Sequence, residues 1–328
     1  MIEIVALSEA MREAVGLAER VAPTNANVLV TGESGSGKDA LASFIHSRSP
    51  RAPQSLVKID CATLPADLLE AELFGYERGA FTGATEAKPG RMEAAHQGTL
   101  VLDEIAHLSL DGQAKLLRVI EHREFERLGG RKTISVDARL IALTNADLKN
   151  AVERRAFRDD LFYRLNVVQI AVPPLRERRK DIDTLARALV STYAGKHGRP
   201  ARKLSRAAQD LLMVYEFPGN VRELANIIER AVIVCSTPEV ETADLPESVR
   251  IAAAQQARKG RRPTLAEIES DYIRETLSAT RGNKTEAAKI LGISRKNLYE
   301  RLAREKKEVR DQRAEVREDA LETGSSDD

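Results

Sequence analysis

Hydrophobic residues in the first half of the chain gather in short runs that are apolar on consecutive positions. Such runs are typical of strands buried on both faces in a parallel sheet. Helical patterns separate them, which predicts an α/β fold with crossover helices between the strands. The five expected strands are NVLV (27–30), LVKID (56–60), TLVLDEI (99–105), ARLIALTN (138–145) and VVQIAV (167–172).

Helical spacing replaces this pattern at the start of the chain and after residue 172. Near the N-terminus Met11, Val15, Ala18 and Val21 recur at helical spacing, and Ser8 stands where the N-cap of that helix would be. After a Pro-Pro pair come three helical patterns without strands between them, at 181–193, 205–215 and 220–235. They predict a small helical domain.

Composition and periodicity divide the chain into five segments. Residues 251–263 lose the hydrophobic pattern and gain charge, as a linker between domains does. A last compact helical unit and a charged stretch follow. The expected segments are an α/β subdomain at 1–172, a helical subdomain at 173–250, the linker at 251–263, a C-terminal helical unit at 264–305 and a disordered tail at 306–328.

Charge is distributed unevenly along the C-terminal segments. The 328 residues carry a formal net charge of only +1, and 42% of them are hydrophobic, enough for a large core and an appended domain. Between Arg281 and Lys307, however, nine Lys and Arg residues stand against three Glu. From Glu308 to Asp328 there are eight acids and three Arg. The first block is suited to a polyanion, and the second is typical of a solvated tail.

Nothing in the chain predicts export, a membrane span or a metal cluster. No apolar run approaches the ~18 residues of a membrane helix, and the first residues include Glu3, Glu9 and Glu13, so we expect a cytoplasmic location. Cys61 and Cys235 lie far apart and in no CxxC spacing, which predicts two buried thiols.

The stretch GESGSGKD follows the first strand and precedes a helix, the context that a phosphate-binding loop requires. Backbone N–H groups at a helix N-terminus would surround phosphates, and the lysine ammonium would reach the β and γ oxygens. The alternative is a glycine-rich turn that binds nothing. Asp39 stands where a Ser or Thr commonly contacts Mg²⁺, so the metal needs other ligands. The expected nucleotide-binding residues are Gly32, Glu33, Ser34, Gly35, Ser36, Gly37, Lys38 and Asp39.

The third strand supplies those ligands, because it ends in two adjacent carboxylates. We expect Asp103 beside Mg²⁺, partly through water, and Glu104 where it can polarise the attacking water. At the end of the fourth strand, Asn145 could contact the γ-phosphate or that water, although an Asn in this place is commonly a turn former.

Phosphoryl transfer also needs positive charge beyond the γ-phosphate. Arg158 and Arg164 in FRDDLFYRLN are candidates, and spacing alone favours the alternative that they pair with nearby acids of the same chain. Arg222 in FPGNVREL lies at the start of a predicted helix in the small domain, from where it could close over the nucleotide.

A glycine-flanked segment follows the second strand and carries one aromatic side chain. Two glycines give the backbone freedom on either side of Phe81 and Thr82, and the small alanines add no packing of their own. An exposed aromatic on a mobile loop is suited to contact a partner, whereas the alternative is that Phe81 fills the local core. The segment consists of Gly79, Ala80, Phe81, Thr82, Gly83 and Ala84.

With these motifs in order, the chain from about Ile4 to Arg304 resembles the bacterial enhancer-binding proteins, the AAA+ activators of sigma-54 RNA polymerase. GESGSGKD looks like the Walker A motif of that family, in which an acid after the lysine is usual, and GTLVLDEI looks like its Walker B motif. LTNADL resembles sensor I, FRDDLFYRLN the arginine-finger segment, LRERRKDI the start of the second domain and FPGNVREL sensor II. GAFTGA is the most specific of these motifs.

The resemblance implies an AAA+ P-loop ATPase with a five-stranded parallel sheet, a helical lid and a Fis-type helix-turn-helix. It also implies a ring of about six subunits that binds ATP and Mg²⁺ between neighbours, with Arg158 and Arg164 acting in trans. The GAFTGA loop would contact sigma-54, so that ATP hydrolysis remodels the closed complex of the polymerase.

Two features depart from the family pattern. Members usually have an asparagine at the position of Asp60, where its amide is thought to hold the Walker B glutamate. An aspartate cannot donate such a bond unless it is protonated, so we expect Asp60 and Glu104 to stay apart or to share a proton. Members also carry a regulatory domain before the ATPase, and its absence here fits either a short member controlled by a separate protein or a shortened chain.

The C-terminal unit has the pattern of a helix-turn-helix, in which Ala288 allows two helices to meet, Gly292 turns the chain, and Ile293 and Leu298 fill the core. It resembles the Fis-type domain of the same family, which binds enhancer DNA as a dimer. A basic hairpin that binds only protein is the alternative. The expected DNA-contacting residues are Ser294, which also caps the second helix, Arg295, Lys296, Asn297, Tyr299, Arg301 and Arg304.

Two other functions compete with the sigma-54 activator. One is an ATP-binding regulator that binds DNA and acts with another sigma factor without remodelling, as relatives with a degraded loop do. The intact GAFTGA argues against it. The other is an AAA+ chaperone or protease subunit, which predicts an aromatic-hydrophobic pore loop and no helix-turn-helix.

Overall fold

The computed structural model describes residues 4–201, 203–252, 269–270, 272–273, 276–277, 280, 283–299 and 301. The chain divides into two compact units, Met1–Ala253 and Ala254–Asp328. From residue 253 onward the predicted linker lies outside the described residues, as do the whole predicted tail and Arg304.

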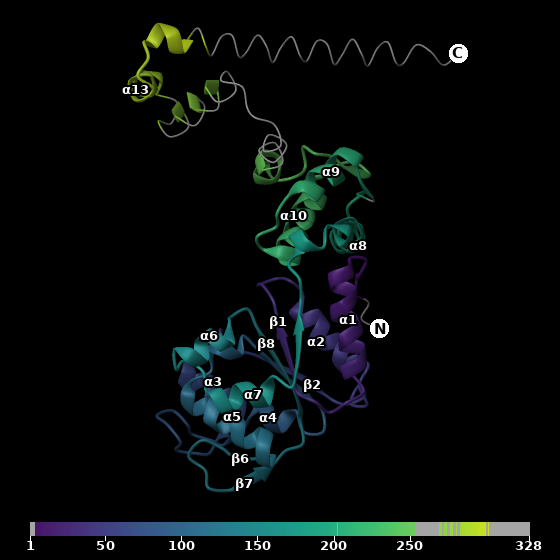
Figure 1. The fold of residues 1–328 in the computed structure, drawn as a ribbon, viewed down its shortest axis with the longest axis vertical. Coiled ribbons are helices and arrows are strands. Elements are labelled where there is room, and N and C mark those ends of the chain that lie inside the picture. The colour runs from purple at the N-terminus through teal and green to yellow at the C-terminus, as the bar shows by residue number, and fades with distance from the viewer. Residues whose placement is uncertain are drawn as a thin grey trace, which may run out of the picture. The chain divides into compact units, whose positions relative to one another are not determined.

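The first unit is built on a five-stranded parallel sheet (Figure 1) with the order β2-β5-β8-β1-β9. Every predicted strand is present, within two residues at each end. The central strands are buried, but the edge strands expose part of both faces, so the expectation of strands apolar on both faces is wrong for β2 and β9. The bounds are β1 Val28–Thr31, β2 Leu56–Asp60, β5 Thr99–Asp103, β8 Arg139–Thr144 and β9 Val168–Ala171.

Helices cover both faces of this sheet (Figure 1) because successive residues of a strand point to opposite sides. On β1, Val28 and Val30 pack with the core under α1 and α2, while Leu29 packs with the core under α3, α5 and α7. The bounds are α1 Glu9–Val21, α2 Lys38–Ser47, α3 Ala66–Phe74, α4 Arg91–Ala94, the 3₁₀ helix η1 Ile105–His107, α5 Leu110–His122, α6 Leu148–Glu153 and α7 Asp159–Leu165.

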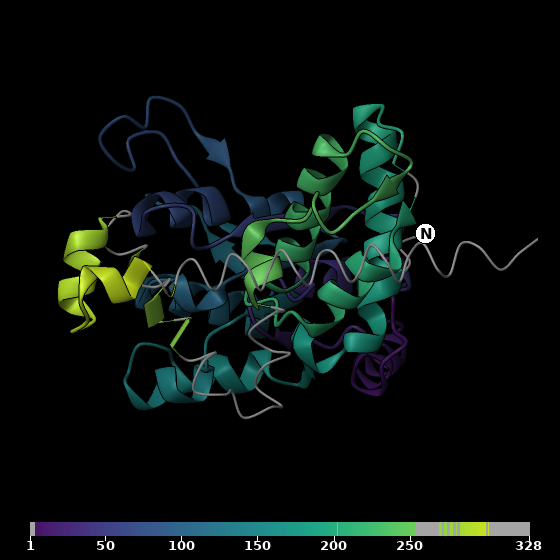
Figure 2. The ribbon, with the colours of Figure 1, turned by 90° about the horizontal axis from the view of Figure 1, so that it is seen from above.

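Two small antiparallel hairpins interrupt the α/β alternation, and sequence patterning missed both. They are β3 (Gly75–Tyr76) with β4 (Lys88–Pro89), and β6 (Glu124–Glu126) with β7 (Thr133–Ser135). Backbone hydrogen bonds between Leu128 and residues 75 and 77 join the two hairpins. In Figure 2 this dark blue part of the chain extends beyond the helices. The segment 79–84 therefore lies at the tip of a projection with a defined base.

The predicted small domain is a helical lid, and its three helices match the predicted patterns to within a few residues. Contrary to the prediction, it contains strands: β10 and β11 form a short parallel pair. Among the described residues, no helix combines the length and apolar character needed to cross a membrane. The elements are η2 Leu175–Glu177, α8 Arg179–His197, β10 Lys203–Leu204, α9 Arg206–Val214, α10 Asn220–Val234 and β11 Glu239–Val240.

The second unit has the expected helix-turn-helix core. Its described helix α13 (Lys284–Ile290) begins after Asn283, whose side chain accepts hydrogen bonds from two backbone N–H groups of the first turn. Ala288 and Leu298 are buried together, and Gly292 has the positive φ of a turn. The next helical stretch, 295–299, begins after Ser294, which accepts a hydrogen bond from the Asn297 N–H as a cap does. These observations confirm the predicted cap and core of the pair.

Helix α1 starts after Ser8 as predicted, but the Ser8 side chain does not cap it. Its hydroxyl instead donates to the Asp181 carboxylate at 2.9 Å, which also accepts the backbone N–H groups of Leu7 and Ser8 at 2.7 and 2.8 Å. Asp181 belongs to α8 of the lid and is fully buried. The helical periodicity of the sequence could not predict this bond, because its partners lie more than 170 positions apart.

We expect Asp181→Ala to lower the free energy of unfolding by about 2–5 kcal/mol, because it leaves three donors, two of them buried, without an acceptor. Asp181→Asn keeps the oxygen that accepts both backbone N–H groups and should cost less. Ser8→Ala removes one bond and is the matched control. Urea denaturation followed by circular dichroism measures all three, and equal losses for the Ala and Asn variants would contradict this account.

Candidate functional site

The loop between β1 and α2 has a backbone that only glycine adopts easily. Gly35 and Gly37 have φ values of +73° and +105°, and α2 begins at the next residue, Lys38. A Cβ on Gly35 would lie 2.5 Å from the carbonyl oxygen of Gly219, and a Cβ on Gly32 2.7 Å from that of Val172. The loop therefore presents N–H groups at a helix N-terminus, the arrangement that binds phosphate.

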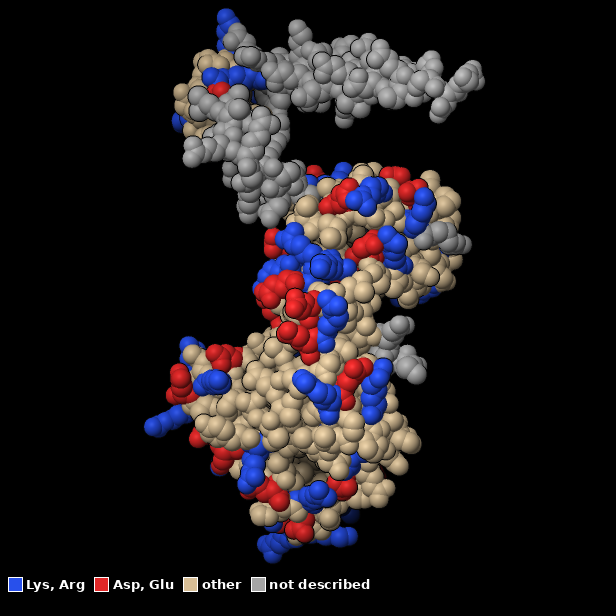
Figure 3. Space-filling model, turned by 45° about the vertical axis from the view of Figure 1, so that its right-hand side comes forward, with Lys and Arg blue, Asp and Glu red and all other residues tan. Residues whose placement is uncertain are grey.

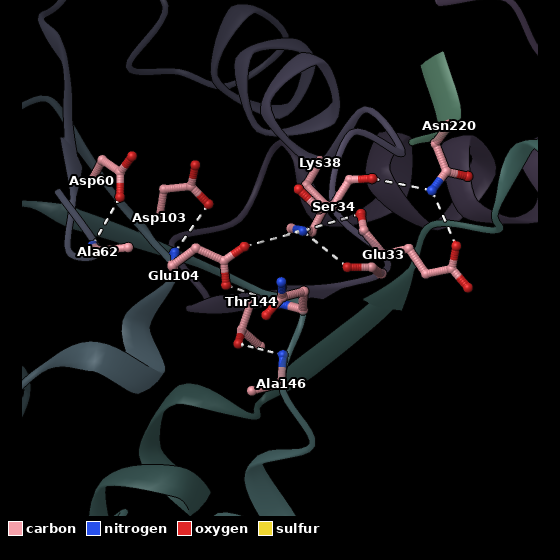
Figure 4. A network of polar contacts seen from close by, with 12 residues as sticks. Glu33, Ser34, Lys38, Asp60, Ala62, Asp103, Glu104, Thr144, Ala146 and Asn220 are labelled. Carbon is pink, nitrogen blue, oxygen red and sulfur yellow. Dashed lines mark hydrogen bonds and ion pairs between the residues drawn. The ribbon is translucent and has the colours of Figure 1, made fainter. Parts of the chain in front are cut away.

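Lys38 is the buried cation of this loop. Its ammonium donates to the carbonyl oxygens of Gly32 and Glu33 at 2.9 and 3.3 Å and lies 3.6 Å from a carboxylate oxygen of Glu104 (Figure 4). The hydroxyl of Ser36 is also buried and has no hydrogen-bond partner among the described residues. The cradle thus holds a cation and an unpaired polar group, which fits an anionic ligand.

Glu104 follows β5 in a left-handed conformation with φ of +51°. That conformation directs its side chain across the loop, where one carboxylate oxygen faces Lys38 and the other accepts the Asn145 backbone N–H at 3.1 Å (Figure 4). Asn145 lies at the predicted place, but the contact it makes here is through its backbone rather than its side chain.

Asp103 lies at the end of β5, and three nearby features raise its pKa: its burial, and the negative charges of Asp39 and Glu104. Mutual repulsion of carboxylates in one place favours a bound cation. No group of three or more His, Cys, Asp or Glu side chains in the described part of the chain has a metal-binding arrangement. A single carboxylate plus phosphate oxygens and water is a common way of holding Mg²⁺, so Asp103 fits that role. Asp39 itself pairs with Lys58 at 3.0 Å.

Asp60 and Glu104 have separate hydrogen-bond partners, which agrees with the first of two expected arrangements, that they stay apart or share a proton. Asp60 accepts the backbone N–H of Ala62 at 2.9 Å, while Glu104 has separate partners. Because β2 pairs with β5 in parallel, Asp60 is the register partner of Asp103 and not of Glu104 (Figure 4). The structure shows no bond by which Asp60 could hold the glutamate.

The lid contacts the phosphate loop through residues that sequence analysis partly missed. Arg176 of η2 forms a two-pronged ion pair with Glu33 at 2.7 and 2.8 Å, and Asn220 donates to the same carboxylate at 3.0 Å. These bonds lower the pKa of Glu33 to about 2. Arg222, which was predicted, donates to the Ser34 hydroxyl at 2.9 Å. Figure 3 shows acidic and basic side chains side by side where the two subdomains meet.

The signal for the missed residues was present but not specific. Asn is one of the few residues that adopt positive φ readily, and Asn220 follows a Pro-Gly pair in FPGNVREL. Arg176 is one of several arginines in LRERRKDI, and only the fold shows that it faces Glu33 while Arg178 turns inward to the Ser36 carbonyl and the sulfur of Met11.

The two candidate finger arginines lie at the ends of α7 and pair with acids of their own chain. Arg158 forms two hydrogen bonds with Asp160 at 2.7 and 3.0 Å, and Arg164 contacts Glu121 at 3.0 Å. This is the alternative that spacing favoured. Both guanidinium groups are partly exposed, and exposed pairs contribute only ~0–1 kcal/mol, so either arginine can exchange its partner at small cost.

The GAFTGA segment forms a turn with hydrogen bonds between its own backbone groups. Gly79 donates its N–H to the Ala84 carbonyl at 2.8 Å, and the Ala84 N–H donates to Phe81 at 3.0 Å, which closes the turn. Ala84 is buried, so the prediction that the alanines add no packing is wrong. Phe81 packs edge-on against Tyr76 yet remains 41% exposed, between the two alternatives. Gly79 and Gly83 have φ of +82° and +102°, and a Cβ on either would meet no atom within 4 Å.

The candidate DNA-contacting residues of the second unit lie together at the start of its second helix. Arg295 and Lys296 are exposed in the first turn. Asn297 accepts a hydrogen bond from Arg301 at 2.7 Å, and the Lys284 ammonium lies 4.7 Å from the centre of the Tyr299 ring.

Comparison with known protein families now decides the class of this site. The family profile of the Sigma-54 interaction domain matches residues 4–171, that of the AAA+ ATPase lid domain 176–262, and that of the Fis family of bacterial regulatory proteins 264–304. The chain belongs to the sigma-54-dependent transcriptional activators. The predicted family, the AAA+ P-loop fold, the ATPase class and the Fis-type DNA-binding domain are thereby confirmed.

Individual relatives agree. The chain is similar to regulatory protein AtoC of Escherichia coli, with 44% identity over 303 residues, 90% of this chain and 66% of the relative. It is similar to nitrogen fixation protein AnfA of Azotobacter vinelandii, with 45% identity over 92% of this chain and 57% of the relative. The crystal structure of NtrX from Brucella abortus in complex with ADP superimposes with a TM-score of 0.70 at 35% identity, covering 92% of this chain and 69% of that one. The chain spans about two thirds or less of these relatives' length.

We expect Glu104→Gln to retain nucleotide binding, because the phosphate loop and Asp103 remain, and to lower ATP turnover roughly 10²- to 10⁴-fold, because an amide does not accept a proton from water. Phosphate release and fluorescent ADP binding measure the two effects. Glu19→Gln makes the same chemical change at an exposed position paired with Arg48 and is the control. Turnover that survives in Glu104→Gln would show that another group polarises the water.

Proposed function

We propose that the protein hydrolyses ATP in a ring of its own subunits and uses the cycle to remodel the closed complex of sigma-54 RNA polymerase, with its C-terminal unit bound to enhancer DNA. The observation that carries the proposal is a single compact unit that joins a complete phosphate-binding site to a projecting GAFTGA turn. Membership of the sigma-54 activator family supports it.

The site residues have distinct roles in this reaction. The N–H groups of the phosphate loop and the Lys38 ammonium bind and orient the phosphates. Glu104, once it leaves Lys38 and Asn145, accepts a proton from the attacking water. Mg²⁺ at Asp103 would neutralise charge on the phosphate oxygens when bound. NtrX of Brucella abortus was crystallised with ATP and with ADP, which supports nucleotide binding at the corresponding loop.

The partly exposed arginines of α7 are candidates for the positive charge that phosphoryl transfer needs beyond the γ-phosphate. We propose that Arg158 and Arg164 leave Asp160 and Glu121 and approach the nucleotide of a neighbouring subunit. The low free energy of exposed ion pairs supports such an exchange.

Arg164→Ala should lower ATP turnover by a factor of the order of 10³ to 10⁵, the range for arginine fingers. Mixing it with inactive Lys38→Ala subunits should partly restore turnover, because a subunit with a sound finger then adjoins one with a sound site. Arg118→Ala, at an exposed pair with Glu126, is the control. A mixture no more active than its components would place the finger in its own chain's site instead.

The GAFTGA turn is separate from the phosphate site and contains no group that hydrolysis needs. Phe81 could contribute ~1.5–3 kcal/mol if its exposed part became buried against a partner. We propose sigma-54 as that partner, and the exposed Thr82 beside it as a second contact.

Phe81→Ala and Thr82→Ala should hydrolyse ATP and bind enhancer DNA near normally, yet fail to bind sigma-54 with an ATP transition-state analogue and fail to open promoters. Ile233→Ala removes a similarly exposed apolar side chain from the lid. This control should still bind sigma-54 and open promoters. ATP-dependent open-complex formation with purified sigma-54 polymerase, and with sigma-70 polymerase as comparison, tests the whole proposal. Parallel loss of ATPase activity in the loop variants would mean that the segment is structural. Activation of sigma-70 polymerase alone would favour the regulator that acts without remodelling.

A further inference from the structure

Asn220 is a buried polar residue at the start of α10 with an uncommon backbone conformation. Its φ is +54°, and its side chain has no exposed surface. The amide oxygen accepts the Leu175 N–H at 2.7 Å. The amide nitrogen donates to Glu33 and to the Ser34 carbonyl, each at 3.0 Å (Figure 4). Both ends of one amide are therefore used, and neither is left for a ligand.

These contacts join two parts of the structure that are far apart in sequence. Glu33 and Ser34 belong to the phosphate loop, whereas Leu175 begins the lid. The neighbouring backbone adds a further bond, because the Val221 N–H donates to the Gly35 carbonyl at 3.0 Å. The turn at 219–221 thus lies directly on the phosphate loop, and its side chain at 220 also fixes the first residue of the lid.

We propose that Asn220 is a positioning residue for nucleotide binding, which holds the phosphate loop in its binding shape and ties the lid to it. A glycine-rich loop loses much conformational freedom on ordering, and a neighbour that holds it in advance reduces that cost. The Ser34 carbonyl is fixed by the amide of Asn220, so the peptides on either side keep their N–H groups directed into the phosphate site.

The chemistry of the contact is specific to an amide. Glu33 and the Ser34 carbonyl can only accept hydrogen bonds, and the Leu175 N–H can only donate, so residue 220 must offer a donor on one side and an acceptor on the other. Asn220→Asp keeps the size and the acceptor but loses the donor, and places a carboxylate against Glu33. Asn220→Gly keeps the positive φ and loses the whole side chain.

Reversing the contact tests it. In the double variant Asn220→Asp with Glu33→Gln, the glutamine amide becomes the donor and the aspartate the acceptor, and the net charge is that of the wild type. We expect Asn220→Asp and Asn220→Gly each to raise the Kd for a fluorescent ADP analogue roughly ten- to a hundredfold. The double variant should recover part of the loss from Asn220→Asp, because it restores a hydrogen bond at residue 33 but supplies no donor to the Ser34 carbonyl. For ATP hydrolysis, KM should rise more than kcat falls, because saturating nucleotide itself orders the loop.

The test uses the full chain and includes a control in the lid and a substitute variant. Ser205→Ala removes the cap of α9, whose hydroxyl accepts the Ala208 N–H at 3.2 Å, and so weakens the lid without touching the phosphate loop. It should bind ADP as the wild type does. Should Asn220→Asp fail to fold, Asn220→Gly carries the test alone, since it retains the turn.

Three outcomes would overturn the proposal. Wild-type affinity in Asn220→Gly would mean that only the backbone turn matters. A similar loss in Ser205→Ala would point to lid stability in general. A double variant as weak as Asn220→Asp would show that the contact with Glu33 does not transmit the effect. None of these readings involves sigma-54, so they stand apart from the remodelling proposal.

Discussion

Five parallel strands that end at one edge of a sheet are the constraint on which the nucleotide site depends. Parallel strands place all their carboxyl ends together, so Lys38 after β1, Asp103 after β5 and Asn145 after β8 become neighbours although more than a hundred residues separate the first from the last. The ion pair between Lys38 and Glu104 spans this edge. Any change in strand order or register would separate the phosphate loop from the carboxylates that serve it.

The lid depends on the same edge. Arg176 of its first turn and Asn220 at the start of α10 bond to the phosphate loop. Asp181 of α8 bonds to the segment just before α1. These bonds are buried or two-pronged. Removing one partner of such a bond costs more stability than removing one partner of an exposed ion pair. The arginines of α7, by contrast, have exposed partners. The molecule therefore combines a firmly held phosphate loop with ion pairs on α7 that can be exchanged readily.

Sequence alone predicted those parts of the fold whose signal is local. The buried strands follow from apolar runs, the phosphate loop from its glycines between strand and helix, and the lid helices from their periodicity. The hairpins around the GAFTGA segment escaped because strands of two or three residues have no measurable alternation. Ser8 has the residue type and position of an N-cap. Its hydroxyl instead donates to Asp181, because this buried carboxylate from the lid competes for it.

The candidate site shows the same division. Lys38, Asp103 and Glu104 were predictable because each belongs to a short motif of consecutive residues. The positions of Asn220 and Arg176 depend on which surfaces the fold brings together, and the backbone contact of Asn145 with Glu104 likewise follows from the fold and not from residue type. Residue type and spacing identify the members of a site more readily than they identify the atoms that act.

The glycines of the GAFTGA turn have one further consequence, because backbone handedness and not space requires them. Gly79 and Gly83 have positive φ, and the volume where a side chain would lie is open at both. Positive φ strains an L-residue, but it is the favoured region for a D-residue, whose conformational preferences are the mirror image of those of an L-residue. D-alanine introduced by chemical ligation at either position would therefore favour the φ that the turn already has and would stiffen it, giving a chemical way to vary the rigidity of the loop while Phe81 and Thr82 stay the same.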